Sequence, residues 1–423
     1  MAQTTDATPR TRALPGNDGV GGEGGAPGKR SRLGQWNSAV TSYYLLTGAS
    51  VLLLVLGLVM VLSSSSVDSL ADGGSPYAVF FSQAQFALIG LPLMWLASRL
   101  PVRFYHRFAW FILVGAIVMQ LLVFTPLGIG QGGNRNWILI GGFTAQPSEA
   151  VKLALAIWLG AVLARKRALL QDWKHSIIPA LPVALVAIGV VLMGHDLGTA
   201  LVMLMLVAGA LFVAGVPMRV FGVAGLGAVV AVIGLAVTSE NRMQRISDFF
   251  SGDPDLAAGG YQTLHGTQAL ATGGWFGLGL GQSREKWSYL PEAHNDFIFA
   301  IIGEELGLIG TLLVLLLFAL LALGMFRVIA RHPDPVAQIT TGAIAAWIIG
   351  QALVNMGVVV GLVPVIGVPL PLVSAGGSAL IMTMAALGVV ISFARGEPGA
   401  AEALSARPHV LRRSLAVIGR VRR

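Results

Sequence analysis

Long apolar stretches alternate with short polar segments along most of the chain. A helix needs about 20 mostly apolar residues to cross a bilayer core of about 30 Å. Ten stretches meet this requirement. They predict an all-α polytopic membrane protein with about ten transmembrane helices, near residues 43–62, 79–98, 108–125, 147–164, 176–193, 198–215, 220–238, 297–325, 338–360 and 378–394.

Composition supports this class of protein. Of the 423 residues, 55% are hydrophobic and 11% are charged, against about 25% charged in an ordinary soluble domain. The chain has no cysteine, which excludes a disulfide framework and thiol chemistry.

The positions of Lys and Arg predict the orientation. With both termini in the cytoplasm, 22 of the 28 basic residues lie on the cytoplasmic side, as the positive-inside rule requires. The net charge of +8 is then explained by topology and by contact with anionic membrane lipid, and it does not indicate a nucleic-acid partner.

The two ends differ in composition from the apolar region. Residues 1–37 are rich in Gly, Pro, Thr and Ser and predict a disordered cytoplasmic arm. The arm has no early apolar segment, so we expect no cleaved signal peptide. Residues 38–395 form the predicted transmembrane domain, and residues 396–423 a basic cytoplasmic tail that contacts solvent, lipid or a partner.

The longest predicted loop spans residues 239–296, between the seventh and eighth helices, and lies outside the cytoplasm. Loops of this length are usually functional or disordered. Arg242 and Arg245 have the spacing of one face of a surface helix. The loop ends in "KWSYLPEAHNDFIFAIIGEELG", which concentrates ionisable side chains just before an apolar run: Lys286, Glu292, His294, Asp296, Glu304 and Glu305.

Another predicted outer loop, "RNWILIGGFTAQPSEAVK", leads into the fourth helix, which should begin at Pro147 or Ser148. Glu149 and Lys152 are three residues apart and can form an ion pair on one helix face. Lys152 lies about one turn into the membrane, where an ionisable group needs a partner or a wet cavity.

Two shorter outer segments complete this side. "GHDLGTA" places His195 and Asp196 at a membrane boundary. "GLVPVIGVPLPLVSAGGSA" is rich in Pro and Gly and uncharged. We expect it to be re-entrant or to line a cavity, because irregular backbone at that depth must be shielded from lipid.

These outer segments can bring acids and bases together beside the apolar bundle, which suits a lipid-linked anionic substrate. Glu304 and Glu305 lie about 12 to 14 Å deeper along the helix than Asp296, and we expect them to form a structural network rather than to react. The histidines have no metal-binding spacing.

The motifs carry a family resemblance. "RNWILIGGFTAQPSEAVK", "HDLGTA", "SYLPEAHNDFIFAIIGEELG" and "PLPLVSAGGSA" together look like the SEDS proteins, the FtsW and RodA family of bacterial cell-wall synthesis. The resemblance covers about residues 43 to 395. It implies ten transmembrane helices and a peptidoglycan glycosyltransferase that polymerises lipid II on the outer face of the cytoplasmic membrane. It also implies a class B penicillin-binding protein as partner.

Two stretches, "GLVMVLSSSSV" and "QFALIGLPLMWLASRLP", resemble the division branch, FtsW, more than the elongation branch, RodA. The division branch implies the septum as location, and a septal transpeptidase and the division regulatory complex as partners. An elongation polymerase of the RodA type is the alternative within the family.

The family's candidate catalytic aspartate corresponds to Asp296 in "HNDF". Its Glu and Lys on the fourth helix match Glu149 and Lys152, and a further aspartate matches Asp196. Some positions depart from the family: Asn295 replaces Thr, Gly194 and His195 replace Gln-Pro, Asn136 replaces the Arg before the Trp, and "SAGGSA" replaces Ser-Tyr-Gly-Gly-Ser-Ser. These departures affect Arg135 and His195 more than Asp296.

We expect Asp296 to act as the general base on the acceptor 4-hydroxyl, with inversion at the anomeric carbon. Because pyrophosphate is a good leaving group, no second catalytic carboxyl is required, unlike in a glycosidase. The expected cations around pyrophosphate are Arg135, Lys152, Arg242, Arg245 and Lys286, and the predicted substrate-binding set also includes Trp137, Glu149, Asp196, Glu292 and His294. The sequence leaves open whether Mg or Mn assists.

Two other classes of function remain open. A lipid II flippase would need the same head-group contacts, although it should carry ionisable residues along a path to both faces. A scaffold that only activates its penicillin-binding partner would not need Asp296.

Overall fold

The computed structural model describes residue 38 and residues 40–71, 75–131, 134–237, 243, 259–287 and 289–405. The described residues from residue 40 onward belong to one compact unit. The predicted arm, Arg242, Arg245 and most of the basic tail lie outside the described residues.

Helices make up most of the described chain. Nine of them are long and apolar enough to cross a membrane. They confirm the predicted fold class, and their bounds are α2 (Thr41–Ala71), α3 (Ala78–Ala97), α4 (Val102–Leu121), α5 (Pro147–Arg165), α6 (Trp173–Ile177) continuing into α7 (Ala180–Met193), α8 (Leu197–Ala214), α12 (Ile298–Arg331), α13 (Pro335–Val359) and α14 (Gly377–Arg395).

The other predicted span, residues 220–238, corresponds to α9 (Met218–Val237). Within α9, the described stretch Met218–Gly227 is apolar but shorter than the nine candidate membrane spans. Two further helices lie outside the predicted spans: α11 (Gly259–Gly273) in the long loop and α15 (Ala400–Ser405) after α14.

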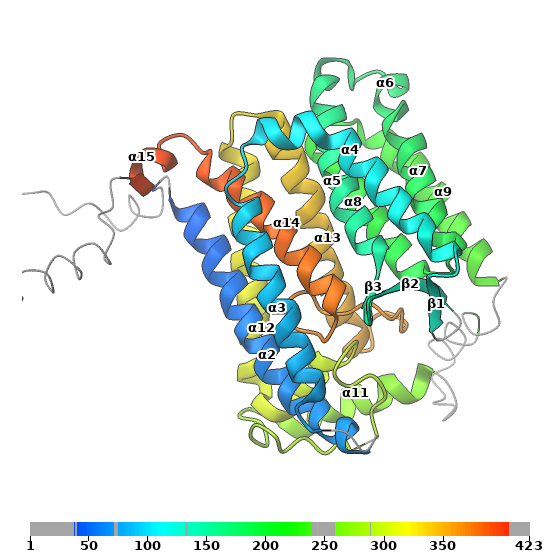
Figure 1. The fold of residues 1–423 in the computed structure, drawn as a ribbon, viewed down its shortest axis with the longest axis vertical. Coiled ribbons are helices and arrows are strands. Elements are labelled where there is room, and N and C mark those ends of the chain that lie inside the picture. Colours follow the sequence, from blue (N-terminus) through cyan, green and yellow to red (C-terminus); the bar gives the residue numbers. More distant parts are fainter. Residues whose placement is uncertain are drawn as a thin grey trace, which may run out of the picture. The chain divides into compact units, whose positions relative to one another are not determined.

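Helix α13 lies at the centre of the bundle. It packs against α5 and α8 on one side and α12 and α14 on the other, while α2 and α3 pack against α12 and α14 (Figure 1). Gly209 on α8 and Gly342 on α13 permit a close crossing, because a Cβ added at Gly209 would lie 2.8 Å from the carbonyl oxygen of Gly342. Small residues allow helix backbones to approach in this way.

A small antiparallel sheet, absent from the predictions, lies between α4 and α5. Its strands are β1 (Gly128–Gln131), β2 (Asn134–Ile140) and β3 (Phe143–Ala145), in that order. Ile140 pairs with Phe143 across Gly141 and Gly142, and both glycines have positive φ. A two-residue Gly-Gly turn between apolar runs is a hairpin signal. The sequence "LIGGF" could therefore have predicted the hairpin of β2 and β3.

Helix α12 is kinked at Gly307, whose φ of 67° and ψ of −163° are not helical. The interruption leaves the carbonyl groups of Glu304 and Glu305 free, and they accept hydrogen bonds from the backbone N–H groups of Leu278 and Gly279 at 2.9 and 3.0 Å. The glycine-rich loop after α11 therefore wraps around the kink.

We predict that Gly307→Ala lowers the free energy of unfolding by about 1–3 kcal/mol, because residues other than glycine rarely adopt these φ and ψ values. An added Cβ would also lie 2.4 Å from the backbone nitrogen of Gly277. Thermal unfolding in detergent measures the effect. Gly189→Ala, in a helix with open space around the new Cβ, is the control; equal melting temperatures for the two variants would contradict this explanation.

Candidate functional site

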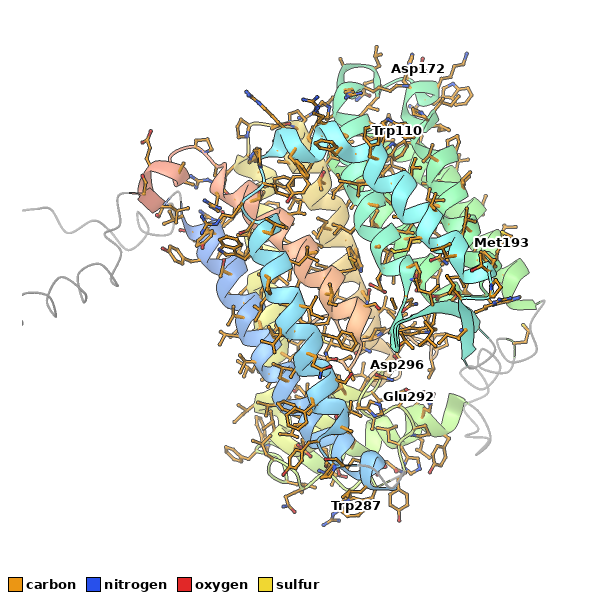
Figure 2. The ribbon with its side chains drawn as sticks, viewed as in Figure 1. Trp110, Asp172, Met193, Trp287, Glu292 and Asp296 are labelled. Atoms are coloured by element: carbon orange, nitrogen blue, oxygen red, sulfur yellow. The ribbon has the colours of Figure 1, made fainter. Side chains whose placement is uncertain are left out.

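A polar cavity of about 300 Å³ lies where α5, α12 and α14 begin and α13 ends. In Figure 2, Asp296 and Glu292 mark this end of the bundle and Asp172 marks the opposite end. The structure brings six of the predicted site residues into the lining of this cavity: Trp137, Glu149, Lys152, Asp196, Glu292 and Asp296.

The first two turns of α5 supply the ion pair of the cavity. Helix α5 begins at Pro147, as predicted, and Lys152 Nζ lies 2.7 Å from Glu149 Oε1. The ammonium group also lies 4.7 Å from the centre of the Trp347 ring and donates to Gln351 Oε1 at 3.4 Å. Only 2% of Lys152 is exposed, so this cation has exchanged water for a carboxylate, an amide and an aromatic face.

Asp196 caps the start of α8. Its carboxylate accepts hydrogen bonds from the backbone N–H of Thr199 at 2.9 Å and from Gln146 Nε2 at 3.1 Å. A carboxylate at an N-cap satisfies free helix N–H groups and interacts favourably with the helix dipole. This local role accounts for part of its conformation, and its side chain still lines the cavity.

The segment before α12 is held by its backbone. Three consecutive carbonyl groups accept hydrogen bonds: that of His294 from the N–H of Ala375 at 3.0 Å, that of Asn295 from Ser374 Oγ at 2.6 Å, and that of Asp296 from Asn355 Nδ2 at 2.7 Å. The Asp296 carboxylate lines the cavity beside Gly367. A Cβ added at Gly367 would lie 3.5 Å from Asp296 Oδ2.

The Pro- and Gly-rich segment 361–376 forms one wall of the cavity, as the sequence predicts for it. Its backbone is anchored by buried side chains. Gln83 on α3 donates to the carbonyl of Ser374 and accepts from the N–H of Gly376, each at 3.1 Å. Non-helical backbone at this depth is thus satisfied by protein groups.

Glu292 has a backbone conformation that non-glycine residues rarely adopt, with a φ of 58°. Its carboxylate accepts a hydrogen bond from Asn295 Nδ2 at 2.6 Å. Such strain is found at functional sites more often than elsewhere. The turn exposes Glu292 at the mouth of the cavity.

Three other predicted substrate-binding residues, which the structure describes, do not line the cavity. The guanidinium group of Arg135 donates to the carbonyl of Thr125 at 2.9 Å. His294 contributes its backbone carbonyl to the segment described above. Lys286 is buried and its ammonium group lies 3.2 Å from Glu305 Oε1. Arg242 and Arg245 lie outside the described residues.

Glu304 and Glu305 are fully buried and bind the loop around α12. Glu304 accepts hydrogen bonds from the hydroxyl of Ser283 and from the backbone N–H groups of Arg284 and Glu285. Glu305 accepts from Ser63 on α2 and from Lys286. These contacts are those that a structural network would make, and they tie the loop to α2 and α12.

Sequence reasoning missed the neutral amides of the site. Gln83, Gln351 and Asn355 are all buried within membrane helices, where polar side chains face the protein interior. Their position deep within apolar helices is the sequence signal that could have identified them, because an uncharged amide there also needs a hydrogen-bond partner.

Within the described part of the chain, no three His, Cys, Asp or Glu side chains converge as a metal site. The lining contains four carboxylates, and Lys152 is the one cation among the described lining residues. The lining can therefore accept protons from hydroxyl groups and neutralise an anionic group at Lys152.

In a comparison with protein-family sequence models, residues 44–397 match the FtsW/RodA/SpoVE family, which is described as "Cell cycle protein". The chain belongs to this family. The resemblance drawn from the motifs is therefore confirmed.

Relatives within the FtsW/RodA/SpoVE family cover most of the chain. The probable peptidoglycan glycosyltransferase FtsW of Mycobacterium tuberculosis is 41% identical over 96% of this chain and 78% of its own length. Stage V sporulation protein E of Bacillus subtilis is 36% identical over 83% of this chain and 96% of its own length. A solved structure described as "Structural coordination of polymerization and crosslinking by a peptidoglycan synthase complex" is 29% identical, with a TM-score of 0.69, over 83% of this chain and 96% of its own.

We predict that Lys152→Met lowers the free energy of unfolding by about 3–5 kcal/mol, because the carboxylate of Glu149 would stay buried without its cation. Adding Glu149→Gln should restore most of the loss. Chemical unfolding in detergent measures both variants. If the double variant were as unstable as Lys152→Met, an unpaired carboxylate would not be the cause.

Proposed function

We propose that this membrane protein is a peptidoglycan glycosyltransferase that polymerises lipid II into glycan strands at the outer face of the cytoplasmic membrane. The observation that carries the proposal is the cavity that combines Asp296 with the buried Glu149–Lys152 pair at one end of an apolar bundle. The names of the FtsW relatives support the same activity.

The proposed orientation places the cavity outside the cytoplasm and both termini inside. The described basic residues support it, because those of the loops between α3 and α4 and between α5 and α7 lie at the end opposite to the cavity. The positive-inside rule assigns that end to the cytoplasm.

In the proposed reaction, the carboxylate of Asp296 accepts the proton of the acceptor 4-hydroxyl. The hydroxyl oxygen bonds to the anomeric carbon of the donor sugar as the bond from that carbon to the pyrophosphate oxygen breaks. Polyprenyl pyrophosphate leaves with the negative charge, and the proposed role of Lys152 is to stabilise that charge. The anomeric centre is inverted, since the displacement occurs once. Arg242 and Arg245 remain predicted contributors.

We also propose that the protein acts in cell division. The relative from Mycobacterium tuberculosis, at 41% identity, is named FtsW, which supports action at the septum, with a class B penicillin-binding protein and the division regulatory complex as partners. The likeness to a peptidoglycan synthase complex that couples polymerization to crosslinking supports such a partner. Lipid II and the nascent glycan are the proposed substrates.

The distribution of charge favours an enzyme over a flippase. Among the described membrane-spanning residues, the buried acids and bases Glu149, Lys152, Glu304 and Glu305 lie within about the first two turns of α5 and α12. A flippase should carry ionisable residues along a path to the other face.

We predict that Asp296→Asn lowers polymer formation from purified lipid II by at least about 10²-fold, as loss of a general base does. The assay uses the protein with its penicillin-binding partner and with the transpeptidase blocked. Asp172→Asn is the matched control, because Asp172 caps α6 at the opposite end and Asn is also a good cap. Polymer at the wild-type rate from Asp296→Asn would remove Asp296 from the mechanism.

A further inference from the structure

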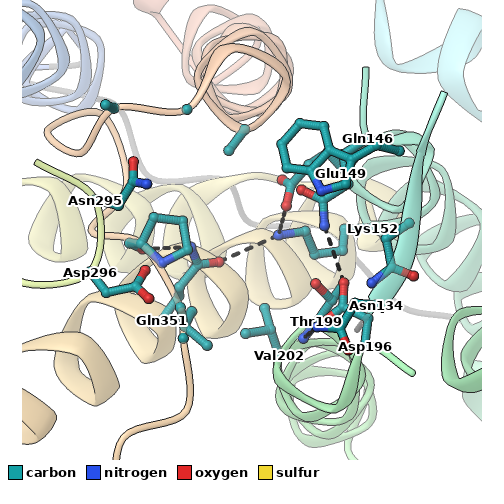
Figure 3. Close-up of a pocket in the computed structure, with 18 of the residues that line it drawn as sticks. Asn134, Gln146, Glu149, Lys152, Asp196, Thr199, Val202, Asn295, Asp296 and Gln351 are labelled. Carbon is teal, nitrogen blue, oxygen red and sulfur yellow. Dashed lines mark hydrogen bonds and ion pairs between the residues drawn. The ribbon is translucent and has the colours of Figure 1, made fainter. Parts of the chain in front are cut away.

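Two buried amide side chains on α13 connect the opposite walls of the cavity. Gln351 and Asn355 are four residues apart and therefore share one helix face, and only 3% and 2% of them are exposed. In Figure 3, Gln351 lies between Asp296 and Lys152. Polar groups so deep in an apolar bundle are costly unless their hydrogen bonds are made.

Gln351 contacts the wall that contains Lys152. Its Oε1 accepts hydrogen bonds from Lys152 Nζ at 3.4 Å and from Trp347 Nε1 at 3.0 Å. Its Nε2 donates to the carbonyl of Pro369 at 2.8 Å. One amide thus joins the cation of α5 to the segment 361–376.

Asn355 contacts the wall that contains Asp296. Its Nδ2 donates to the carbonyl of Asp296 at 2.7 Å and to that of Val368 at 2.8 Å. Val368 and Pro369 are consecutive, so the two amides hold adjacent carbonyl groups of the same segment. A continuous chain of contacts therefore connects Lys152 to Asp296. It passes through Gln351, residues 368–369 and Asn355.

We infer that Gln351 and Asn355 are positioning residues that set the Asp296 carboxylate relative to the Lys152 ammonium group. The inference rests on the proposed function, because the two groups act together on one sugar pyrophosphate. A base and a leaving-group cation must be held in register for a single displacement, and a misplacement of about 1 Å can cost about 10²-fold in rate. Neither amide takes part in the proton transfer.

The test measures kcat and KM for glycan polymerisation by the complex with its penicillin-binding partner. We expect Asn355→Leu and Gln351→Leu to lower kcat and kcat/KM together by about 10²-fold, as for an interaction realised in the transition state. Gln120→Leu is the matched control: Gln120 is a fully buried amide of α4 whose side chain has no hydrogen-bond partner among the described residues. It should keep the wild-type kcat.

A merely structural role would lower the folded fraction, so kcat is expressed per folded molecule from thermal unfolding of each variant. Asn355→Ala, which removes the amide donor without adding bulk, is measured beside Asn355→Leu in case the larger side chain prevents folding. In the Asp296→Asn background, Asn355→Leu should cost nothing further. A wild-type kcat in Asn355→Ala or Asn355→Leu would overturn the inference.

The results separate the two proposals. If Asp296→Asn polymerises normally, the base assignment fails and the positioning inference fails with it. If Asp296→Asn is inactive while the folded amide variants match Gln120→Leu, the positioning inference alone fails.

Discussion

Backbone groups within a bilayer must find hydrogen-bond partners inside the protein, and this constraint governs the cavity end of the bundle. Besides the β-sheet, the cavity is lined by irregular segments that include the one with Asp296 and the one with Gly367. Their carbonyl groups are bound by Asn355, Gln351, Ser374 and Gln83. Without these donors an open polar cavity could not exist beside lipid, because the irregular backbone would be unsatisfied.

The same constraint explains how charges are placed. Two buried acids are paired with lysines, Glu149 with Lys152 and Glu305 with Lys286, and buried Glu304 accepts hydrogen bonds from Ser283 and two backbone N–H groups. The first pair lies in the cavity and the second lies under the loop that leads to Asp296. The pairs are chemically alike and both are buried, so their neighbours, rather than residue type, separate a candidate reactive site from a structural one.

Sequence patterns were sufficient for the nine membrane-spanning helices of the described residues, because apolar length decides membrane insertion, and for the Glu149–Lys152 pair, because helix spacing brings those residues together. They did not predict α11 and α15. Lys286 shows the limit of such reasoning. Its neighbours in the sequence are polar and suggest a substrate contact, but in the folded loop its ammonium group lies beside Glu305 of α12. The cavity wall also depends on amides from α3 and α13. Gln83 is 291 residues from Ser374 and Asn355 is 59 residues from Asp296, and no local pattern reveals such contacts.

The central claim is that lipid II occupies this cavity. Because the chain has no native cysteine, a single cysteine at the lining residue Ala379 can report occupancy through its rate of maleimide labelling. Asp172→Cys, at the opposite end, provides the reference. We predict that lipid II slows labelling of Ala379→Cys and leaves that of Asp172→Cys unchanged. Equal labelling of Ala379→Cys with and without saturating lipid II, in a protein that still polymerises it, would contradict the account.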